Sequence, residues 1–124
     1  LTIVKEKILI QENEREQLVN EIKKMKQQDN EQQQNSYAWT GDTKGYEFLF
    51  SNKLFSDLSK KISKVIVDYL KTLEINTSLL DIYYQRSWAT FTENEQSINY
   101  HTHSQSNISF AYYLLKPKGS GGIL

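Results

Sequence analysis

The sequence lacks cysteine altogether, contains a single proline, and carries no net charge. Without cysteine the chain can form no disulfide bond and can offer no thiolate to a metal ion. Its fifteen basic and fifteen acidic residues are mixed along the chain, which gives no electrostatic reason to expect binding to nucleic acid or to an anionic membrane surface. No apolar run approaches the length of about 20 residues that a transmembrane helix needs.

A chain of 124 residues can bury one core and is at most a single domain. No basic segment followed by an apolar one opens the chain, so a soluble, cytoplasmic protein is expected. The first residue is Leu1 rather than methionine, and Leu124 follows shortly after two adjacent glycines. We therefore expect a fragment or a processed segment.

Two amphipathic helices are predicted in the first half of the chain. From Gln11 to about Gln28, the apolar residues Leu18, Ile22 and Met25, with Val19 alongside, recur at three- and four-residue steps in a Glu/Lys background. Ser51 or Asn52 can cap a second helix that runs to about Leu73. Its apolar stripe comprises Leu54, Leu58, Ile62, Val65, Tyr69 and Leu73.

Two connecting segments lie between these helices. The polar cluster "KQQDNEQQQNS", residues 26–36, predicts a solvated loop. The aromatic residues and two glycines of "SYAWTGDTKGYEFLF", residues 36–50, predict an irregular or extended segment laid over the core.

The apolar pattern then changes to the period of a strand. In "LLDIYYQRSWATF", residues 79–91, alternate side chains fall on opposite faces, and the aromatic and β-branched content predicts a strand. "TENEQS" predicts a turn, "NISFAYYLL" (residues 107–115) a second strand, and the glycine-rich residues 116–122 a further turn. The predicted fold is therefore α+β, with helices packed on a sheet.

Both histidines of the chain stand one residue apart, in "HTH". On a strand, His101 and His103 would point to one face about 6–7 Å apart and could reach one metal ion. The same spacing also suits an exposed strand end with no metal. A functional metal normally takes three or more protein donors, and no third histidine exists. A carboxylate from Asp81, Glu93 or Glu95 could complete the set, and nothing in the spacing selects one.

The quoted motifs resemble a family of oxygenases dependent on Fe(II) and 2-oxoglutarate, with many phage and marine bacterial members. The resemblance covers residues 37–124, in "AWTGDTKGYEFLFSN", a long helix, and "SWATFTENEQSINYHTHSQSNISFAYYLLKPKGSGGIL". The residues that match the family's order of motifs are Trp88, His101, His103, Ser109, Tyr112, Tyr113, Pro117 and Gly122.

The resemblance implies a double-stranded β-helix, that is, a jelly-roll or cupin-like sheet, preceded by helices. It implies one oxygenase domain, residues 1–124, which is incomplete after the first barrel strands. The expected parts are an N-terminal helix and polar loop, an aromatic segment with a long helix, and the first strands with the histidines, at residues 1–36, 37–76 and 77–124.

The resemblance further implies that Fe(II) and 2-oxoglutarate are cofactors. His101 would be the first metal ligand, and His103 would occupy a position that is a carboxylate in most such oxygenases. The third ligand, a distal histidine, and the arginine that binds the far carboxylate of 2-oxoglutarate would lie beyond Leu124. The implied reaction hydroxylates a C–H bond and decarboxylates 2-oxoglutarate to succinate, with no catalytic residue besides the ligands.

Strand parity adds candidates around the metal. Asn107, Ser109 and Tyr113 share a face that would look into the barrel, so they are candidates to hydrogen-bond the cofactor or substrate. Arg86 precedes the histidines and is interpreted as a surface or ion-pairing residue. Core packing is the interpretation for Trp88.

Two alternatives to the oxygenase stay open. One is a cupin-like metalloprotein with other chemistry, and the other is a non-catalytic remnant or interaction module. A sheet cut halfway exposes a strand edge, so a homo-oligomer or completion by a missing C-terminal segment is expected. No nucleic-acid or membrane partner is indicated, and the fold does not choose between a small-molecule and a protein substrate.

Overall fold

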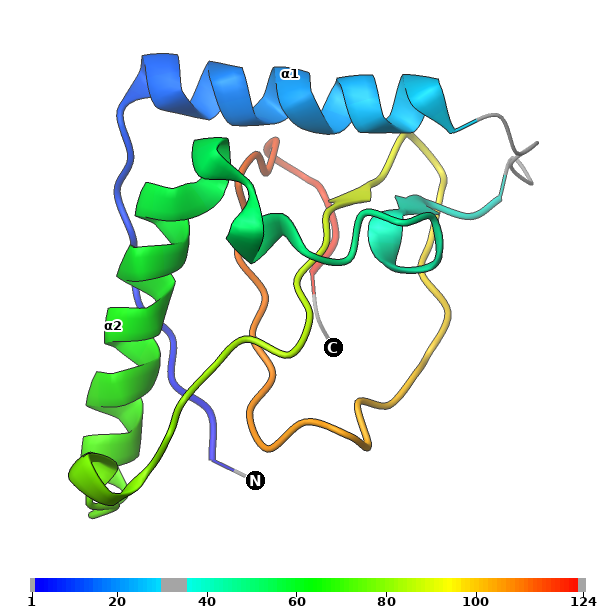
Figure 1. The fold of residues 1–124 in the computed structure, drawn as a ribbon. Helices are drawn as coiled ribbons and strands as arrows, with labels where there is room; N and C mark the ends of the chain where they lie inside the picture. Colours follow the sequence, from blue (N-terminus) through cyan, green and yellow to red (C-terminus); the bar gives the residue numbers. More distant parts are fainter. Residues whose placement is uncertain (1, 30–35, 123–124) are drawn as a thin grey trace.

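The computed structural model describes residues 2–29 and 36–122, which contain two α-helices and one antiparallel pair of short strands. Figure 1 shows the first helix lying across one end of the molecule, with the second at a steep angle to it and the remaining chain looping beside both. The predicted α+β class is confirmed. The elements are α1 (Glu12–Gln28), β1 (Trp39–Thr40), α2 (Ser56–Thr72) and β2 (Thr90–Phe91).

Helix α1 has the predicted bounds to within one residue. Glu12 and Glu14 lie in its first turn, where the helix dipole favours negative charge. Its buried residues are the apolar positions that the periodicity predicted, Leu18, Ile22 and Met25. The sequence pattern therefore fixes both the extent of this helix and the face that it buries.

Helix α2 begins through a 3₁₀ turn, Lys53–Phe55, that runs directly into it. Asn52, one of the two predicted caps, caps this 3₁₀ turn rather than α2 itself, whose N-cap residue Phe55 makes no side-chain cap bond. The Asn52 side-chain oxygen accepts a hydrogen bond of 3.0 Å from the backbone N–H of Leu54. This bond satisfies one of the amides that a helix start leaves without a partner. The helix ends at Thr72, one residue before the predicted end.

The buried face of α2 is narrower than the predicted stripe. Leu58 and Ile62 are buried as expected, and so is Leu70, which the stripe did not include. Leu54 is 44% exposed and Leu73 is 39% exposed, because both lie at the ends of the helix, where little of the chain covers them. The packed face of α2 therefore follows every fourth residue from Leu58 to Leu70, and it is narrower than the apolar stripe predicted from the sequence.

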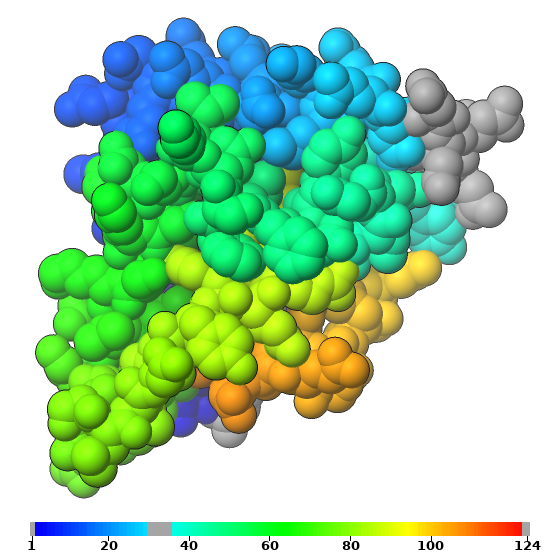
Figure 2. All heavy atoms as spheres, viewed as in Figure 1, coloured from blue at the N-terminus to red at the C-terminus, as the bar shows by residue number. Residues whose placement is uncertain are grey.

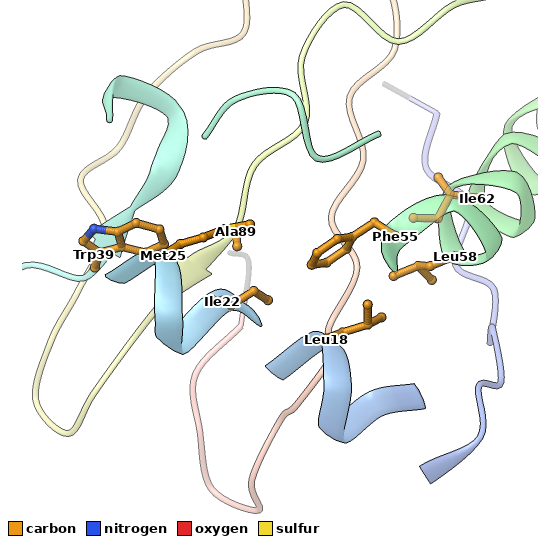
Figure 3. Packing of buried hydrophobic residues seen from close by; sticks show 8 residues of the cluster. All are labelled: Leu18, Ile22, Met25, Trp39, Phe55, Leu58, Ile62 and Ala89. Atoms are coloured by element: carbon orange, nitrogen blue, oxygen red, sulfur yellow. The ribbon is translucent and has the colours of Figure 1, made fainter. Parts of the chain in front are cut away.

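A small apolar core joins the helices to the segments around them (Figure 3). In Figure 3, α1 places Leu18 against the α2 side of the core and Met25 against the β1 side. The two strands pair Trp39 with Phe91 and Thr40 with Thr90. The core residues are Leu18, Ile22, Met25, Trp39, Phe55, Leu58, Ile62 and Ala89.

The segment between the helices covers the core, as predicted. Trp39 is 1% exposed, and its indole Nε1–H donates a 2.8 Å hydrogen bond to Oδ2 of Asp29. Figure 2 shows this part of the chain as a layer between α1 and the yellow-green segment that follows α2. Residues 30–35 of the predicted polar loop lie outside the described residues.

The predicted strands are formed only in part. Of residues 79–91, Thr90 and Phe91 pair in β2, and Ser87 forms an isolated bridge with Phe48. Residues 107–115 were predicted as a strand and form none. In the described part of the chain no jelly roll or double-stranded β-helix is evident. A strand is held by its neighbours, and these segments have too few partners to build a ladder.

The predicted turns are present. In "TENEQS" the backbone N–H of Gln96 donates to the carbonyl of Glu93 at 3.2 Å, and Glu95 has a positive φ of 63°. In the glycine-rich segment the N–H of Ser120 donates to the carbonyl of Pro117 at 3.1 Å. Among residues 2–29 and 36–122, no helix combines the length and the apolar character needed to cross a membrane.

Candidate functional site

The structure brings the two histidine rings together on the surface. The centroids of the His101 and His103 rings lie 4.9 Å apart, with their planes at 80°. Both side chains are exposed, and both residues lie in a loop rather than in a strand. The predicted proximity therefore holds, although the strand that was expected to produce it is not formed.

This spacing fits two imidazoles that share one ion. A metal–nitrogen bond of about 2.1 Å places a ring centre about 3.2 Å from the ion, so two rings at ordinary coordination angles have centres about 4.5–5.3 Å apart. The observed 4.9 Å lies within that interval. The separation is compatible with two positions of a metal site, and it is also the separation of an ordinary edge-to-face contact between two rings.

The backbone carbonyl of Asn99, two residues earlier, orients the His101 ring. The ring Nδ1 lies 2.8 Å from that carbonyl oxygen. Because a carbonyl oxygen can only accept, Nδ1 carries the proton in this hydrogen bond, and a neutral ring then presents the Nε2 lone pair. Metal-binding histidines are commonly oriented in this way.

Trp88 lies against the histidine pair. Its ring centre is 5.9 Å from that of His103, with the planes at 37°. The guanidinium carbon of Arg86 lies 5.3 Å from the centre of the Trp88 ring, and Arg86 Nη2 donates to the carbonyl oxygen of Asp42. The prediction that Trp88 packs in the core is wrong, because its half-buried ring lies between two surface groups.

The predicted cofactor-binding residues are only partly gathered at this site. Ser109 Oγ lies 2.9 Å from Oγ of Ser106, which in turn donates to the carbonyl oxygen of His103 at 3.2 Å. Ser109 is therefore linked to the histidine loop through one residue. Asn107 is exposed, and the ring of Tyr113 lies 4.5 Å from Nζ of Lys116. Their binding role stays a prediction.

In the described part of the chain, no carboxylate joins the histidines in a three-ligand cluster. Among the described residues, no group of three histidine, aspartate or glutamate side chains is arranged to hold a metal ion. Glu93, one of the three candidates, forms a 3.5 Å ion pair with Lys26. Spacing alone could not select among Asp81, Glu93 and Glu95, and the fold brings none of them into such a cluster.

Tyr84 attaches the segment before Arg86 and Trp88 to helix α2. Its hydroxyl donates to the carbonyl oxygen of Ser59 at 2.5 Å and accepts from Ser63 Oγ at 3.0 Å. Its ring also stacks on Phe50, with centroids 5.4 Å apart. Burial raises the pKa of Tyr84 above its ordinary value of 10.0, against the lowering effect of the Ser63 hydrogen bonds.

Replacing Tyr84 by phenylalanine is expected to cost about 1 kcal/mol of unfolding free energy at neutral pH, because the hydroxyl's hydrogen bonds are lost. The raised pKa means that the folded state resists ionisation of Tyr84. This contribution is complete below pH 10.0 and is lost as the pH rises through the folded-state pKa. Urea unfolding across alkaline pH should show a shallower loss of stability in Tyr84→Phe than in wild type.

The matched control is Tyr83→Phe, since that side chain is 78% exposed. It should unfold like wild type at every pH. An equally steep alkaline decline in Tyr84→Phe and wild type would contradict the assignment.

Sequence reasoning missed the contacts that surround the histidines. The alternation of Tyr84, Arg86 and Trp88 was visible, and it placed these residues on one face. Nothing in the sequence indicated that this face would meet His103, because the two segments are joined by a loop without regular pattern. The Asn99 carbonyl that orients His101 is likewise a backbone group, and the residue types of a sequence do not predict which backbone groups will bind a side chain.

No protein-family model matches the chain, and neither do any curated protein or solved structure compared with it. The fold and the site therefore define the class by themselves. It is a small α+β protein that presents two adjacent imidazoles beside a tryptophan and an arginine.

Proposed function

We propose that the protein is an Fe(II)- and 2-oxoglutarate-dependent dioxygenase that hydroxylates a C–H bond. The observation that carries the proposal is the 4.9 Å separation of the His101 and His103 rings, which suits two ligands of one ion. The order of motifs in residues 37–124 supports the choice of this family. The jelly roll of that family is not evident in the described residues, so the proposal rests on the motifs and on the histidine pair.

The histidines' own environment supports their role as ligands. The Asn99 carbonyl holds the Nδ1 proton of His101, which leaves Nε2 as the donor atom toward an ion. Ser106 Oγ donates to the His103 carbonyl, and the Trp88 ring covers part of the His103 ring. The first contact orients the His101 ring, the Ser106 bond holds the backbone at His103, and both imidazoles remain exposed to a ligand from solvent.

Two neutral imidazoles are ligands that Fe(II) accepts, and a third donor would come from outside the described residues. When bound, the iron would supply oxidising chemistry with O₂ as the oxidant, in which one oxygen atom enters the C–H bond as a hydroxyl group and the other enters succinate as 2-oxoglutarate loses carbon dioxide. The protein's part is to set the ligand geometry and to orient the substrate. Ser109 and Tyr113 are the proposed hydrogen-bonding residues for the organic ligands, together with Asn107.

The proposal is tested by anaerobic titration of the protein with Fe(II) and 2-oxoglutarate. We expect the visible charge-transfer absorption of an iron-chelated keto acid, because both carboxylate and keto oxygens would bind the ion. His101→Ala should abolish this band, since one of the two protein ligands is removed. Tyr100→Ala is the matched control, since its side chain is 93% exposed beside the same histidine, and it should keep the band.

Each way of failing contradicts a different part of the proposal. A band of equal strength in His101→Ala would exclude His101 as a ligand. Metal binding that requires His101 but ignores 2-oxoglutarate would favour a cupin-like metalloprotein with other chemistry.

The extended segment 107–115 favours a second function, that of an interaction module. No strand forms there in the described chain, while Phe110 and Leu115 remain exposed. Such a segment can pair with the edge of another chain. Absence of metal binding, together with self-association of the protein, would support this function over the dioxygenase.

A further inference from the structure

Helix α1 has an outer face that its packing against the core leaves uncovered. Glu16, Val19 and Lys23 lie at three- and four-residue steps along the helix, so their side chains share this face. Glu16 and Lys23 are exposed and Val19 is half-buried, whereas the buried residues of α1 belong to the core. Figure 1 shows α1 along the top of the molecule, with α2 below it.

The outer face of α1 borders a surface hollow of about 310 Å³, which Leu115 also lines. Leu115 is 62% exposed. The chain next to it is attached to α1, because Arg15 Nη1 donates a hydrogen bond to the carbonyl oxygen of Leu114. The hollow therefore presents a fixed apolar side chain to solvent beside the half-buried Val19.

Two opposite charges of this face lack partners within the described chain. In residues 2–29 and 36–122 no ion pair engages Glu16 or Lys23, whereas the Glu12 carboxylate lies 3.4 Å from Nε of Arg15. Glu16 and Lys23 stand two helical turns apart, about 10.5 Å along the axis. Val19 lies between them in the sequence. The outer face thus has a negative end, an apolar centre and a positive end.

We propose that the outer face of α1 binds the same face of a second copy of this chain, with the two helices antiparallel. In that arrangement Glu16 of each copy lies opposite Lys23 of the other, and the two Val19 side chains meet near the two-fold axis. Two equivalent ion pairs then form across the interface. The partner would also cover the exposed side chain of Leu115.

The charge pattern favours a second copy because the face is complementary to itself. A two-fold interface uses one surface patch twice, so each negative end must meet a positive end of the same patch. Antiparallel helices meet this condition, whereas parallel helices would bring Glu16 to Glu16 and Lys23 to Lys23, which repel. One helix face is a small contact area, so we expect a weak and reversible dimer.

The test is sedimentation equilibrium of the protein at concentrations up to about 1 mM, where a complex with a dissociation constant of about 1 mM is still substantially formed. We expect a reversible monomer–dimer equilibrium in wild type. Glu16→Lys and Lys23→Glu should each weaken the dimer about tenfold or more, because each change places like charges opposite one another at both ion pairs. Rising salt concentration should weaken the wild-type dimer too, since salt screens exposed charges.

Mixing the two variants tests the pairing itself. Every interhelical pair in a mixed dimer of Glu16→Lys with Lys23→Glu is again one of opposite charge, so the mixture should dimerise although neither variant does so alone. The matched control is Lys60→Glu, which makes the same charge change at an exposed position of α2. On its own it should dimerise like wild type, and in a mixture it should not restore dimerisation to Glu16→Lys.

A further pair of variants tests the apolar part of the interface. Leu115→Ser should weaken the dimer severalfold, because it removes apolar surface that the partner covers. Leu79→Ser is its control, since that side chain is 81% exposed away from the hollow, and it should leave the dimer unchanged.

A wild-type protein that stays monomeric up to about 1 mM would overturn the inference. So would a dimer that Glu16→Lys leaves unchanged, which would place self-association on another surface, such as residues 107–115. The inference does not rest on the dioxygenase proposal, because α1 contributes no residue to the histidine site. Loss of the dimer in Glu16→Lys should accordingly leave the His101-dependent absorption band in place.

Discussion

Replacing Trp39 by alanine is expected to lower the free energy of unfolding by about 3–5 kcal/mol, as truncation of a large buried aromatic residue usually does. Trp39 is 1% exposed and lies in the one core cluster found among the described residues. Folded domains of this size have a free energy of unfolding of only about 5–15 kcal/mol, so the substitution removes a large part of the protein's stability.

Two separate losses contribute to this effect. The first is the cavity left beside Tyr46, whose ring centre lies 6.0 Å from that of Trp39. The second is the hydrogen bond from the indole to the carboxylate of Asp29. That carboxylate keeps Lys44 as a partner, at 3.8 Å from Nζ, so it is not left without any favourable contact.

Chemical denaturation followed by circular dichroism measures the change. Trp39→Phe keeps an aromatic ring but lacks the N–H, and should cost about 1–3 kcal/mol, an intermediate loss that stays measurable even if the alanine variant does not fold. Tyr100→Ala serves as the exposed control and should stay within about 0.5 kcal/mol of wild type. An alanine variant at position 39 that unfolds like wild type would show that the core does not depend on Trp39.

The helices of this protein could be predicted from sequence because their signals are local. The three- and four-residue spacing of Leu18, Ile22 and Met25 reports one face of a helix without knowledge of what covers it. Asn52 is equally local, since its side chain caps a backbone N–H two residues away. Such signals do not depend on the rest of the fold.

The strands failed as predictions because pairing is not local. The alternating pattern of residues 79–91 indicates an extended backbone with two distinct faces. In the structure this segment pairs only through β2 and through the isolated bridge at Ser87. A ladder needs a neighbouring edge that the alternation cannot reveal. The sequence predicted that the aromatic segment covers the core, but it did not show which of its aromatic residues is buried, because the segment has neither helical nor strand periodicity.

The same distinction between local and non-local signals applies to the candidate site. Spacing in sequence was enough to bring His101 and His103 together, since residues two apart cannot be far from one another in space. Their contact with Trp88, and the position of Arg86 over its ring, depend on how two separate segments fold against each other. The expected barrel placed Asn107 and Tyr113 around the metal, and the structure does not bring them to the histidines in the way it brings Trp88.

His101→Ala is expected to weaken binding of a divalent transition metal about 100-fold or more. Substitutions that merely disturb the orientation of a ligand cost about 10–100-fold, and removal of one of two protein donors should cost at least as much. Isothermal titration calorimetry with Co²⁺ measures this affinity without oxidation of the metal. Thr102→Ala is the matched control, since it alters the residue between the histidines and should leave affinity within about twofold.

The double variant decides whether the histidines act on the same ion. If His101 and His103 bind one ion, each single substitution removes most of the affinity, and combining them adds little. If each imidazole binds a separate ion on its own, each single substitution removes one site from the stoichiometry and leaves the affinity of the other unchanged. Wild-type affinity in His101→Ala would place the metal elsewhere. The rings at 4.9 Å would then be a packing contact beside Trp88, and the dioxygenase proposal would lose the observation that supports it.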